Sequence, residues 1–395
     1  MAVIALIDGE HHPAAVRDAL ARIEAERSLA GVVFCGGEEK LADGSLEQHY
    51  GRPVETEPEQ GLRRLAAGAD AVVDLADEPV LPPRAKLRLA ALALHLGLRY
   101  EAPGLRLDPP TYEPVAFDDP RLAVIGTGKR TGKTAVAGHW AGLLREHGAD
   151  PVIVCMGRGG PGEPRAAEAD LTLEHLVAIA DAGEHAASDY LEDAVLARVR
   201  TVGCRRVGGG LAGAPWESNV PAGAALAASL PGADALVFEG SGACIPPVQV
   251  DRTVCVIGPG EPEPMAEYRL MRAQLLLAHV DAPAPPEAVR FSLRPEPAEP
   301  LPEGARVALF TTGAPECEGV AALLTSTNLA RRGALAADLE RAAAEDCDVY
   351  LTELKAAAID TVARHALARG ARVVFVRNRP MGADEALVNL YRDVA

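Results

Sequence analysis

The chain has 395 residues, of which 48% are hydrophobic and 4% aromatic, which is enough apolar sequence for the cores of two or three domains. The net charge of −17 and the isoelectric point near 5.1 argue against nucleic acid as a partner, because such binding depends on clustered Lys and Arg. Seven cysteines without a C-x-x-C pair, no signal peptide and no apolar run of about 18 residues indicate a cytoplasmic protein that has no disulfide framework, zinc site or membrane segment.

Short apolar runs alternate with helical patterns along the chain, which is typical of α/β domains with a mostly parallel sheet. The expected strands cover residues 2–8, 31–35, 69–76, 121–127, 151–156, 234–240, 252–258, 306–312, 348–353 and 372–378. A Pro- and Asp-rich stretch at 107–120 interrupts this alternation. We therefore expect a smaller N-terminal α/β domain over residues 1–118 and a nucleotide-binding, catalytic domain over residues 119–395. A second proline-rich stretch, 282–302, is either another boundary or an insertion.

The segment VIGTGKRTGKTAVAGHW, residues 124–140, runs from a strand through a glycine-rich turn into an amphipathic helix. Gly132, Lys133 and Thr134 close the turn in the order of a phosphate-binding loop, where the lysine contacts the outer phosphates and the hydroxyl binds Mg²⁺. The helix N-terminus also favours an anion. The common pattern has glycine five positions before Gly132, where this chain has Thr127. The expected nucleotide contacts in the loop are Gly126, Thr127, Gly128, Thr131, Gly132, Lys133 and Thr134.

The segment ALVFEGSG, residues 235–242, is expected to be a buried strand with Glu239 at its carboxyl end. Ligands of open α/β sheets gather outside the carboxyl ends of strands, so Glu239 and the phosphate loop are expected to share one crevice. A carboxylate there can bind Mg²⁺ directly or through water. The alternative is a solvated glutamate at a strand end. With Thr134, Glu239 forms the expected metal site.

Several segments together resemble a known family. The loop GTGKRTGKT has the length and frame of the loop of dethiobiotin synthetases, and EGSG resembles the E-G-A-G strand end of that family. Across the chain, LIDGEHHP, VVDLADEPVLPP, GTGKRTGKT, CMGRGGPGEP, EGSGACIPP and TSTNLARR resemble the cyclic 2,3-diphosphoglycerate synthetase family. The resemblance implies a P-loop NTPase fold of the dethiobiotin synthetase type and an ATP- and Mg²⁺-dependent ligase. The implied reaction closes 2,3-diphosphoglycerate into a cyclic phosphoanhydride and releases ADP and phosphate. We also expect a homodimer.

Such a reaction brings a substrate with two phosphates and a carboxylate against the phosphates of ATP, so cations are required. Lys129 and Arg130 lie inside the loop, where they can bridge the γ-phosphate and an acceptor phosphate. Arg158 follows the next strand of the domain and is expected to point into the same crevice, where a guanidinium can bind two phosphate oxygens at once. Lys129, Arg130, Lys133 and Arg158 are the expected catalytic residues, and Arg158 is also expected to bind substrate.

The N-terminal turn offers further polar groups. Asp8, Glu10, His11 and His12 follow the first strand and can bind a phosphate, a metal or the glycerate carboxylate. A turn of Asp, Gly and Pro is equally how a strand leads into a helix. The family resemblance favours substrate binding for these four residues. The acids of SDYLEDA, residues 188–194, can reach Mg²⁺, but we expect them to cap a helix and face water.

Other positions have less specific patterns. Asn378 is expected at the carboxyl end of the last strand, and the resemblance to dethiobiotin synthetases implies that it contacts adenine. Glu353 and Lys355 lie beyond the preceding strand, where nucleotide, substrate and surface roles stay open. Arg205 and Arg206 precede a second glycine run, but an isolated arginine is more often a solvated surface residue.

Two other functions share this loop. A dethiobiotin-synthetase-like carboxylating enzyme has an uncharged diamine as its acceptor, and its loop has polar or acidic residues where this chain has Lys129 and Arg130. A partner-binding switch ATPase of the partition type carries a lysine immediately after the first glycine of the common pattern. That glycine corresponds to Thr127 here, so the position of the lysine is held by Gly128. The basic pair thus favours an anionic acceptor, and both alternatives stay open.

Overall fold

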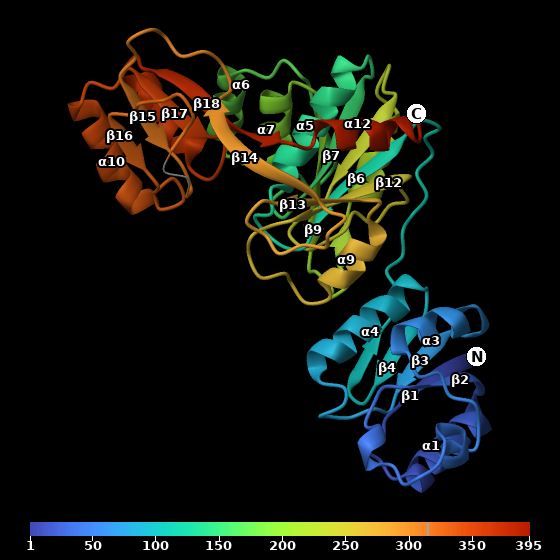
Figure 1. The fold of residues 1–395 in the computed structure, drawn as a ribbon. Helices are drawn as coiled ribbons and strands as arrows, with labels where there is room; N and C mark the ends of the chain where they lie inside the picture. Colours follow the sequence, from blue (N-terminus) through green and yellow to red (C-terminus); the bar gives the residue numbers. More distant parts are fainter. Residues whose placement is uncertain (314–315) are drawn as a thin grey trace. The chain divides into compact units, whose positions relative to one another are not determined.

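The computed structural model describes residues 1–313 and 316–395, which divide into two compact units (Figure 1). The first unit consists of residues Met1–Thr111, Leu211–Gly213 and Glu263–Arg272, and the second of Tyr112–Gly210, Ala214–Pro262 and Ala273–Ala395. Strands and helices alternate in both units, so the α/β class expected from the sequence is confirmed.

The first unit is built on a five-stranded sheet. Its strands are β1 (Ala2–Ile7), β2 (Ser28–Phe34), β3 (Ala71–Asp74), β4 (Arg99–Ala102) and β5 (Leu105–Leu107). Their order is β2-β1-β3-β4-β5; β5 runs antiparallel to β4, and the other neighbours are parallel. Its helices are α1 (Pro13–Glu26), α2 (Leu46–Tyr50), α3 (Pro58–Leu65), α4 (Pro83–His95) and α9 (Ala266–Arg272), with 3₁₀ turns at Glu38–Lys40 and Ala66–Gly68. The apolar run of β1 is buried on both faces, as a central parallel strand requires.

The second unit is built on a larger sheet. Its strands are β6 (Arg121–Gly126), β7 (Pro151–Gly157), β8 (Arg165–Ala167), β9 (Arg200–Val207), β10 (Glu217–Ser218), β11 (Ala235–Glu239), β12 (Arg252–Ile257), β13 (Leu275–His279), β14 (Val289–Pro297), β15 (Val307–Phe310), β16 (Leu324–Ser326), β17 (Val349–Glu353) and β18 (Arg372–Met381). Their order is β10-β9-β7-β11-β6-β12-β13-β14-β18-β17-β15-β16, and β8 pairs beside β9. The strand of the phosphate loop, β6, is therefore central, with β11 and β12 as its neighbours.

Strand β14 connects the two halves of this sheet. Its first residues pair in parallel with β13, and its last six, from Ser292 to Pro297, pair antiparallel with β18. Figure 1 shows β14 extending from the P-loop half toward the C-terminal strands. The proline-rich stretch 282–302 thus contains a sheet strand. Backbone pairing through β14 consequently joins the C-terminal strands to the half of the sheet that carries the phosphate loop.

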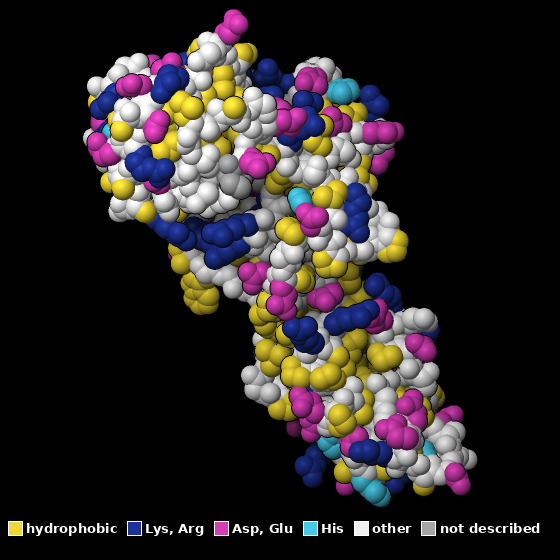
Figure 2. Space-filling model, turned by 60° about the vertical axis from the view of Figure 1, so that its left-hand side comes forward, with side chains coloured by type: hydrophobic (Ala, Val, Ile, Leu, Met, Phe, Trp, Pro, Cys, Tyr) yellow, Lys and Arg dark blue, Asp and Glu magenta, His cyan; other side chains and the backbone are white. Residues whose placement is uncertain are grey.

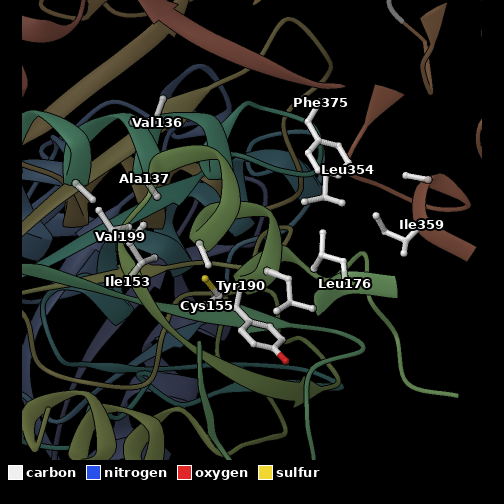
Figure 3. Close-up of a cluster of buried hydrophobic side chains, with 14 of the residues drawn as sticks. Val136, Ala137, Ile153, Cys155, Leu176, Tyr190, Val199, Leu354, Ile359 and Phe375 are labelled. Carbon is white, nitrogen blue, oxygen red and sulfur yellow. The ribbon is translucent and has the colours of Figure 1, made fainter. Parts of the chain in front are cut away.

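The helices of the second unit cover the sheet and share one apolar core. They are α5 (Lys133–Glu146), α6 (Leu173–Asp181), α7 (Asp189–Ala197), α8 (Val220–Ala228), α10 (Arg332–Ala344), α11 (Arg364–Ala368) and α12 (Asp384–Arg392), with a π-helical turn at Ala358–Ala363. Figure 3 shows side chains of α5, α6 and α7 in one cluster with residues near β17 and β18. Trp140 of α5 is fully buried in this core, and its Nε1 donates a 3.0 Å hydrogen bond to the carbonyl oxygen of Leu387 in α12.

Trp140→Phe should destabilise the second unit, because it removes buried volume and the hydrogen bond from the indole to the Leu387 carbonyl. We expect a loss of about 2–4 kcal/mol in the free energy of unfolding, measured by urea denaturation followed by circular dichroism. Trp216→Phe is the matched control, because Trp216 is 89% exposed and its replacement should change stability by less than about 0.5 kcal/mol. Equal losses in both variants would contradict the role given to Trp140.

Candidate functional site

The turn between β6 and α5 has the close backbone packing that a phosphate loop needs. A Cβ at Gly126 would lie 2.6 Å from Thr131 Oγ1 and 3.0 Å from the carbonyl oxygen of Val256, so only glycine fits. Gly132 adopts φ +97°, a left-handed conformation that favours glycine, and a Cβ there would lie 3.0 Å from Leu293 Cδ1 of β14. Thr127 is buried at the position where the common loop pattern has glycine.

Lys133, the first residue of α5, is buried under this loop. Its Nζ donates hydrogen bonds to the Gly128 carbonyl oxygen at 2.7 Å and to Thr131 Oγ1 at 3.4 Å. Burial lowers the pKa of this ammonium, and the charge of Glu239 partly opposes that shift. The ammonium is therefore held at the inner side of the loop, where a bound phosphate would provide the stronger partner.

Thr134 and Glu239 meet as the sequence predicts. Thr134 Oγ1 donates a 2.5 Å hydrogen bond to Glu239 Oε1, and Glu239 is 3% exposed. Burial raises the pKa of Glu239 to about 8, and the charge of Asp189 adds to the shift. Its Oε2 is buried and has no hydrogen-bond partner among the described residues. A hydroxyl, a carboxylate and an unsatisfied buried carboxylate oxygen fit a divalent cation such as Mg²⁺.

A cavity of about 1500 Å³ opens over this point in the second unit. The cations Lys129, Arg130 and Arg158 line it, and among the described residues none of the three forms a hydrogen bond or an ion pair. Arg130 has φ +56°, an uncommon conformation for a residue other than glycine and one that is concentrated at functional sites. The cavity wall therefore offers unpaired positive charge next to the expected metal site.

The turn after β11 accommodates two of the arginines. A Cβ at Gly242 would lie 2.6 Å from Arg158 Nη2 and 3.4 Å from Arg206 Nη2, so glycine leaves room for both guanidinium groups. Arg206 is buried and donates to the carbonyl oxygens of Gly208 and Ser241, at 2.6 and 2.9 Å. The expectation of a solvated surface arginine is therefore wrong for Arg206, which stabilises the turn, while Arg205 is exposed.

The acids of α7 differ from the expectation that they face water. Glu192 and Asp193 are 8% and 3% exposed, and both line the cavity. Asp193 Oδ2 accepts a 3.3 Å hydrogen bond from Cys155 Sγ, and Glu192 pairs with Lys355 Nζ at 3.3 Å. Burial raises the pKa of Glu192 to about 7. This expectation was wrong because the apolar face of α7 packs on β7 and β9 and carries these two acids inward with it. The apolar residues on either side of them were the available signal.

The C-terminal strands supply the opposite wall. Asn378 lines the cavity but lies inside β18, opposite Pro295 of β14, because β18 continues to Met381 and does not end at residue 378 as expected. Pairing with β14 extends β18 beyond its apolar run, which explains the difference. Glu353 is buried and accepts from the backbone N–H and the Oγ1 of Thr312, both at 2.7 Å. The charge of Glu192 raises the pKa of Lys355. Glu353 and Lys355 therefore belong to the cavity wall.

The N-terminal polar turn lies in the first unit and is internally hydrogen-bonded. Asp8 is fully buried, and its Oδ1 accepts from the backbone N–H groups of Glu10 and His11, both at 3.1 Å, and from His11 Nδ1 at 2.8 Å. Glu10 pairs with Lys40 at 2.6 Å, and His12 caps α1 by accepting from the Ala14 N–H. Asp8, His11 and His12 thus have partners inside this segment, whereas Glu10 Oε1 is buried without a partner among the described residues. Substrate binding by this turn stays a prediction.

A central glycine-rich loop with a buried lysine, a Thr–Glu pair at the next strand and unpaired cations in a deep cavity define a P-loop nucleotide-binding enzyme of the α/β class. The chain matches three domains of one family, namely the N-terminal domain of cyclic 2,3-diphosphoglycerate synthetase over residues 2–108, its P-loop domain over 121–279 and its C-terminal domain over 303–379. The chain belongs to the cyclic 2,3-diphosphoglycerate synthetase family, as the resemblance predicted.

Curated relatives agree over nearly the whole chain. Cyclic 2,3-diphosphoglycerate synthetase of Rubrobacter xylanophilus is 43% identical, covering 99% of this chain and 97% of its own length. The proteins of the same name from Thermococcus gammatolerans and Methanothermobacter thermautotrophicus are 38% and 36% identical, over 99% and 97% of this chain and 97% and 93% of their own lengths. Among the described residues, none of the helices has the length and apolar character needed to cross a bilayer.

Replacing Glu239 should change how the stability of the ligand-free protein depends on pH. The pKa of Glu239 is about 8 in the folded state, against a usual value of 4.5, so between these values the folded protein retains a proton that the unfolded chain releases. The stability that this group contributes is therefore fully present below pH 4.5, and it is lost as the pH rises from 4.5 to about 8. In Glu239→Gln, the free energy of unfolding should fall less steeply between about pH 5 and pH 8.

The control for this measurement is Glu345→Gln, because Glu345 is exposed and lies outside the cavity. Its pH profile should match that of the unsubstituted protein in urea denaturation at each pH. An unchanged slope in Glu239→Gln would mean that Glu239 is ionised in the folded protein.

Proposed function

We propose that this protein catalyses the ATP-dependent ring closure of 2,3-diphosphoglycerate to cyclic 2,3-diphosphoglycerate, with release of ADP and phosphate. Its relatives carry the name of this synthetase. One structural observation carries the proposal, namely that Lys129, Arg130 and Arg158 are unpaired within the described part of a chain of net charge −17 and line the cavity of the phosphate loop. Unpaired cations at that place suit an acceptor that is itself a phosphate.

The reaction consists of two displacements at phosphorus. An oxygen of one substrate phosphate attacks the γ-phosphorus of ATP, the bond to the ADP oxygen breaks, and a phosphoanhydride forms on the substrate. An oxygen of the other substrate phosphate then attacks the substrate phosphorus of that anhydride, inorganic phosphate leaves, and a P–O–P bridge closes the ring. Both nucleophiles are already anionic, so the protein has to position them and neutralise charge.

The residues of the cavity have different roles in this reaction. Lys133 would contact the β- and γ-phosphates, and its burial under the loop would make that interaction strong. Lys129 and Arg130 would neutralise charge between the donor and acceptor phosphates, and Arg158, whose guanidinium lies beside Gly242, would bind the substrate. Thr134 and Glu239 are the residues that would hold Mg²⁺, which when bound neutralises charge on the nucleotide phosphates. Asn378 is the proposed adenine contact.

Membership of the synthetase family argues against a carboxylating enzyme or a partner-binding switch ATPase. Asp8, Glu10, His11 and His12 stay proposed substrate contacts, and the homodimer, the cytoplasmic location and the lack of a nucleic-acid partner stay predictions. The mass of the purified protein in solution tests the homodimer. Substrate affinity after replacement of Glu10, whose carboxylate pairs with the exposed Lys40, tests the N-terminal contacts.

Product analysis tests the function directly. Purified protein with ATP, Mg²⁺ and 2,3-diphosphoglycerate should release ADP and phosphate in equal amounts and give a cyclic product by ³¹P NMR. Lys133→Ala should lower kcat by at least about 10²-fold, because charge on the transferring phosphate is no longer neutralised. Release of ADP that does not depend on diphosphoglycerate would favour a switch ATPase, and a requirement for bicarbonate and a diamine would favour a carboxylating enzyme. Either result would overturn the proposal.

Arg130 and Arg158 should have different kinetic effects. Charge crowding is greatest as donor and acceptor phosphates meet, so Arg130→Ala should keep ATP affinity within about threefold but lower kcat about 100-fold. Arg158→Ala should mainly raise the KM for diphosphoglycerate, by about 10-fold or more, because it removes a charge-assisted hydrogen bond to substrate. Arg369→Ala is the control, since Arg369 is exposed and outside the cavity. Equal effects on ATP and diphosphoglycerate in both variants would refute this division.

A further inference from the structure

Beneath the nucleotide position, three buried side chains converge that the proposed reaction does not use together. Cys155 in β7 and Glu239 at the end of β11 are register partners on adjacent parallel strands, so their side chains lie side by side on one face. Asp193 of α7 is the third residue. One donor atom of Cys155, one of Asp193 and one of Glu239 all lie within 4.8 Å of one another. Figure 3 shows Cys155 in the core cluster that also contains Tyr190 of α7.

The cluster contains a buried polar atom without a hydrogen-bond partner among the described residues. Glu239 is 3% exposed, and its Oε2 has no hydrogen-bond partner within the described part of the chain. All three residues are nearly fully buried and lie at the edge of the large cavity, whose lining includes them. Gly138 of α5 leaves space for Asp193, because a Cβ there would lie 3.0 Å from Asp193 Oδ1. A buried carboxylate oxygen without a partner is costly, and a cation is a partner that would remove that cost.

The spacing of the donors matches coordination to a single ion. Cys155 Sγ and Asp193 Oδ2 are 3.3 Å apart. On a tetrahedral cation, bonds of about 2.3 Å to sulfur and 2.1 Å to oxygen separate the two donors by about 3.6 Å. The pair therefore needs only a small adjustment to share a cation, and Glu239 would provide the third ligand.

We propose that Cys155, Asp193 and Glu239 bind a divalent transition-metal cation, next to the Mg²⁺ position at Thr134 and sharing Glu239 with it. A thiolate is a soft ligand that suits Zn²⁺, Co²⁺ or Fe²⁺, whereas Mg²⁺ takes oxygen ligands and is bound poorly by sulfur. The site thus selects a different class of ion from the nucleotide. This inference does not depend on which acceptor the enzyme phosphorylates.

Cobalt provides the test, because a sulfur ligand gives Co²⁺ a near-ultraviolet charge-transfer absorption that oxygen ligands do not give. The full-length protein, without nucleotide, is titrated with Co²⁺ alone. We expect saturable binding of one ion per chain with the charge-transfer band present. Cys155→Ser should abolish the band, and Asp193→Asn should weaken Co²⁺ binding at least about 10-fold. Excess Mg²⁺ should not displace the bound cobalt.

The matched control is Cys35→Ser, because Cys35 is the half-buried cysteine while the six others are buried, and it lies in the first unit. Its variant should keep the band. Both test substitutions preserve shape, and an unchanged urea midpoint verifies that each variant is folded; if Cys155→Ser does not fold, Asp193→Asn decides. A titration without the band, or a band that persists in Cys155→Ser, would leave only a hydrogen-bonded core cluster and overturn the proposal. Product formation with Mg²⁺ is measured separately, so either proposal can fail alone.

Discussion

The hydrogen bond from Thr134 to Glu239 joins the first turn of α5 to the carboxyl end of β11, and the rest of the site is arranged around it. It is possible only because β11 lies directly beside β6, the strand that leads into the phosphate loop. The same sheet order places Cys155 of β7 next to Glu239 on the other side. One local contact therefore sets where a cation, a nucleotide phosphate and the acids of α7 can meet.

Charged side chains of both signs line the cavity. The acids Glu192, Asp193 and Glu239 are buried at its floor, whereas Lys129, Arg130 and Arg158 are exposed at its wall. Lys133 is a buried cation among these acids, and Lys355 pairs with Glu192, so the three exposed cations are the ones available to an anionic acceptor. On the face drawn in Figure 2, Lys and Arg side chains gather in a band on the second unit, although the chain as a whole is acidic.

The C-terminal strands are part of this site because of β14. Leu293 of β14 packs against Gly132, and the pairing of β14 with β18 brings Asn378 into the cavity wall. The ion pair of Lys355 with Glu192 adds a second connection between the C-terminal strands and α7. A phosphate loop on a parallel sheet is open on one side, and here the C-terminal strands supply the missing wall.

The sequence by itself determined the phosphate loop, because the glycines, Lys133 and Thr134 act through backbone geometry that is local to nine residues. It also located Glu239, since a buried strand in an α/β chain delivers its last residue to the ligand-binding edge. The burial of Asp193 and its contact with Cys155 were decided only by the tertiary structure. The two residues are 38 positions apart, and which face of α7 meets the sheet depends on packing that no short pattern encodes. Asn378 is comparable, because the end of β18 is determined by its pairing with the distant strand β14 and not by its own apolar run.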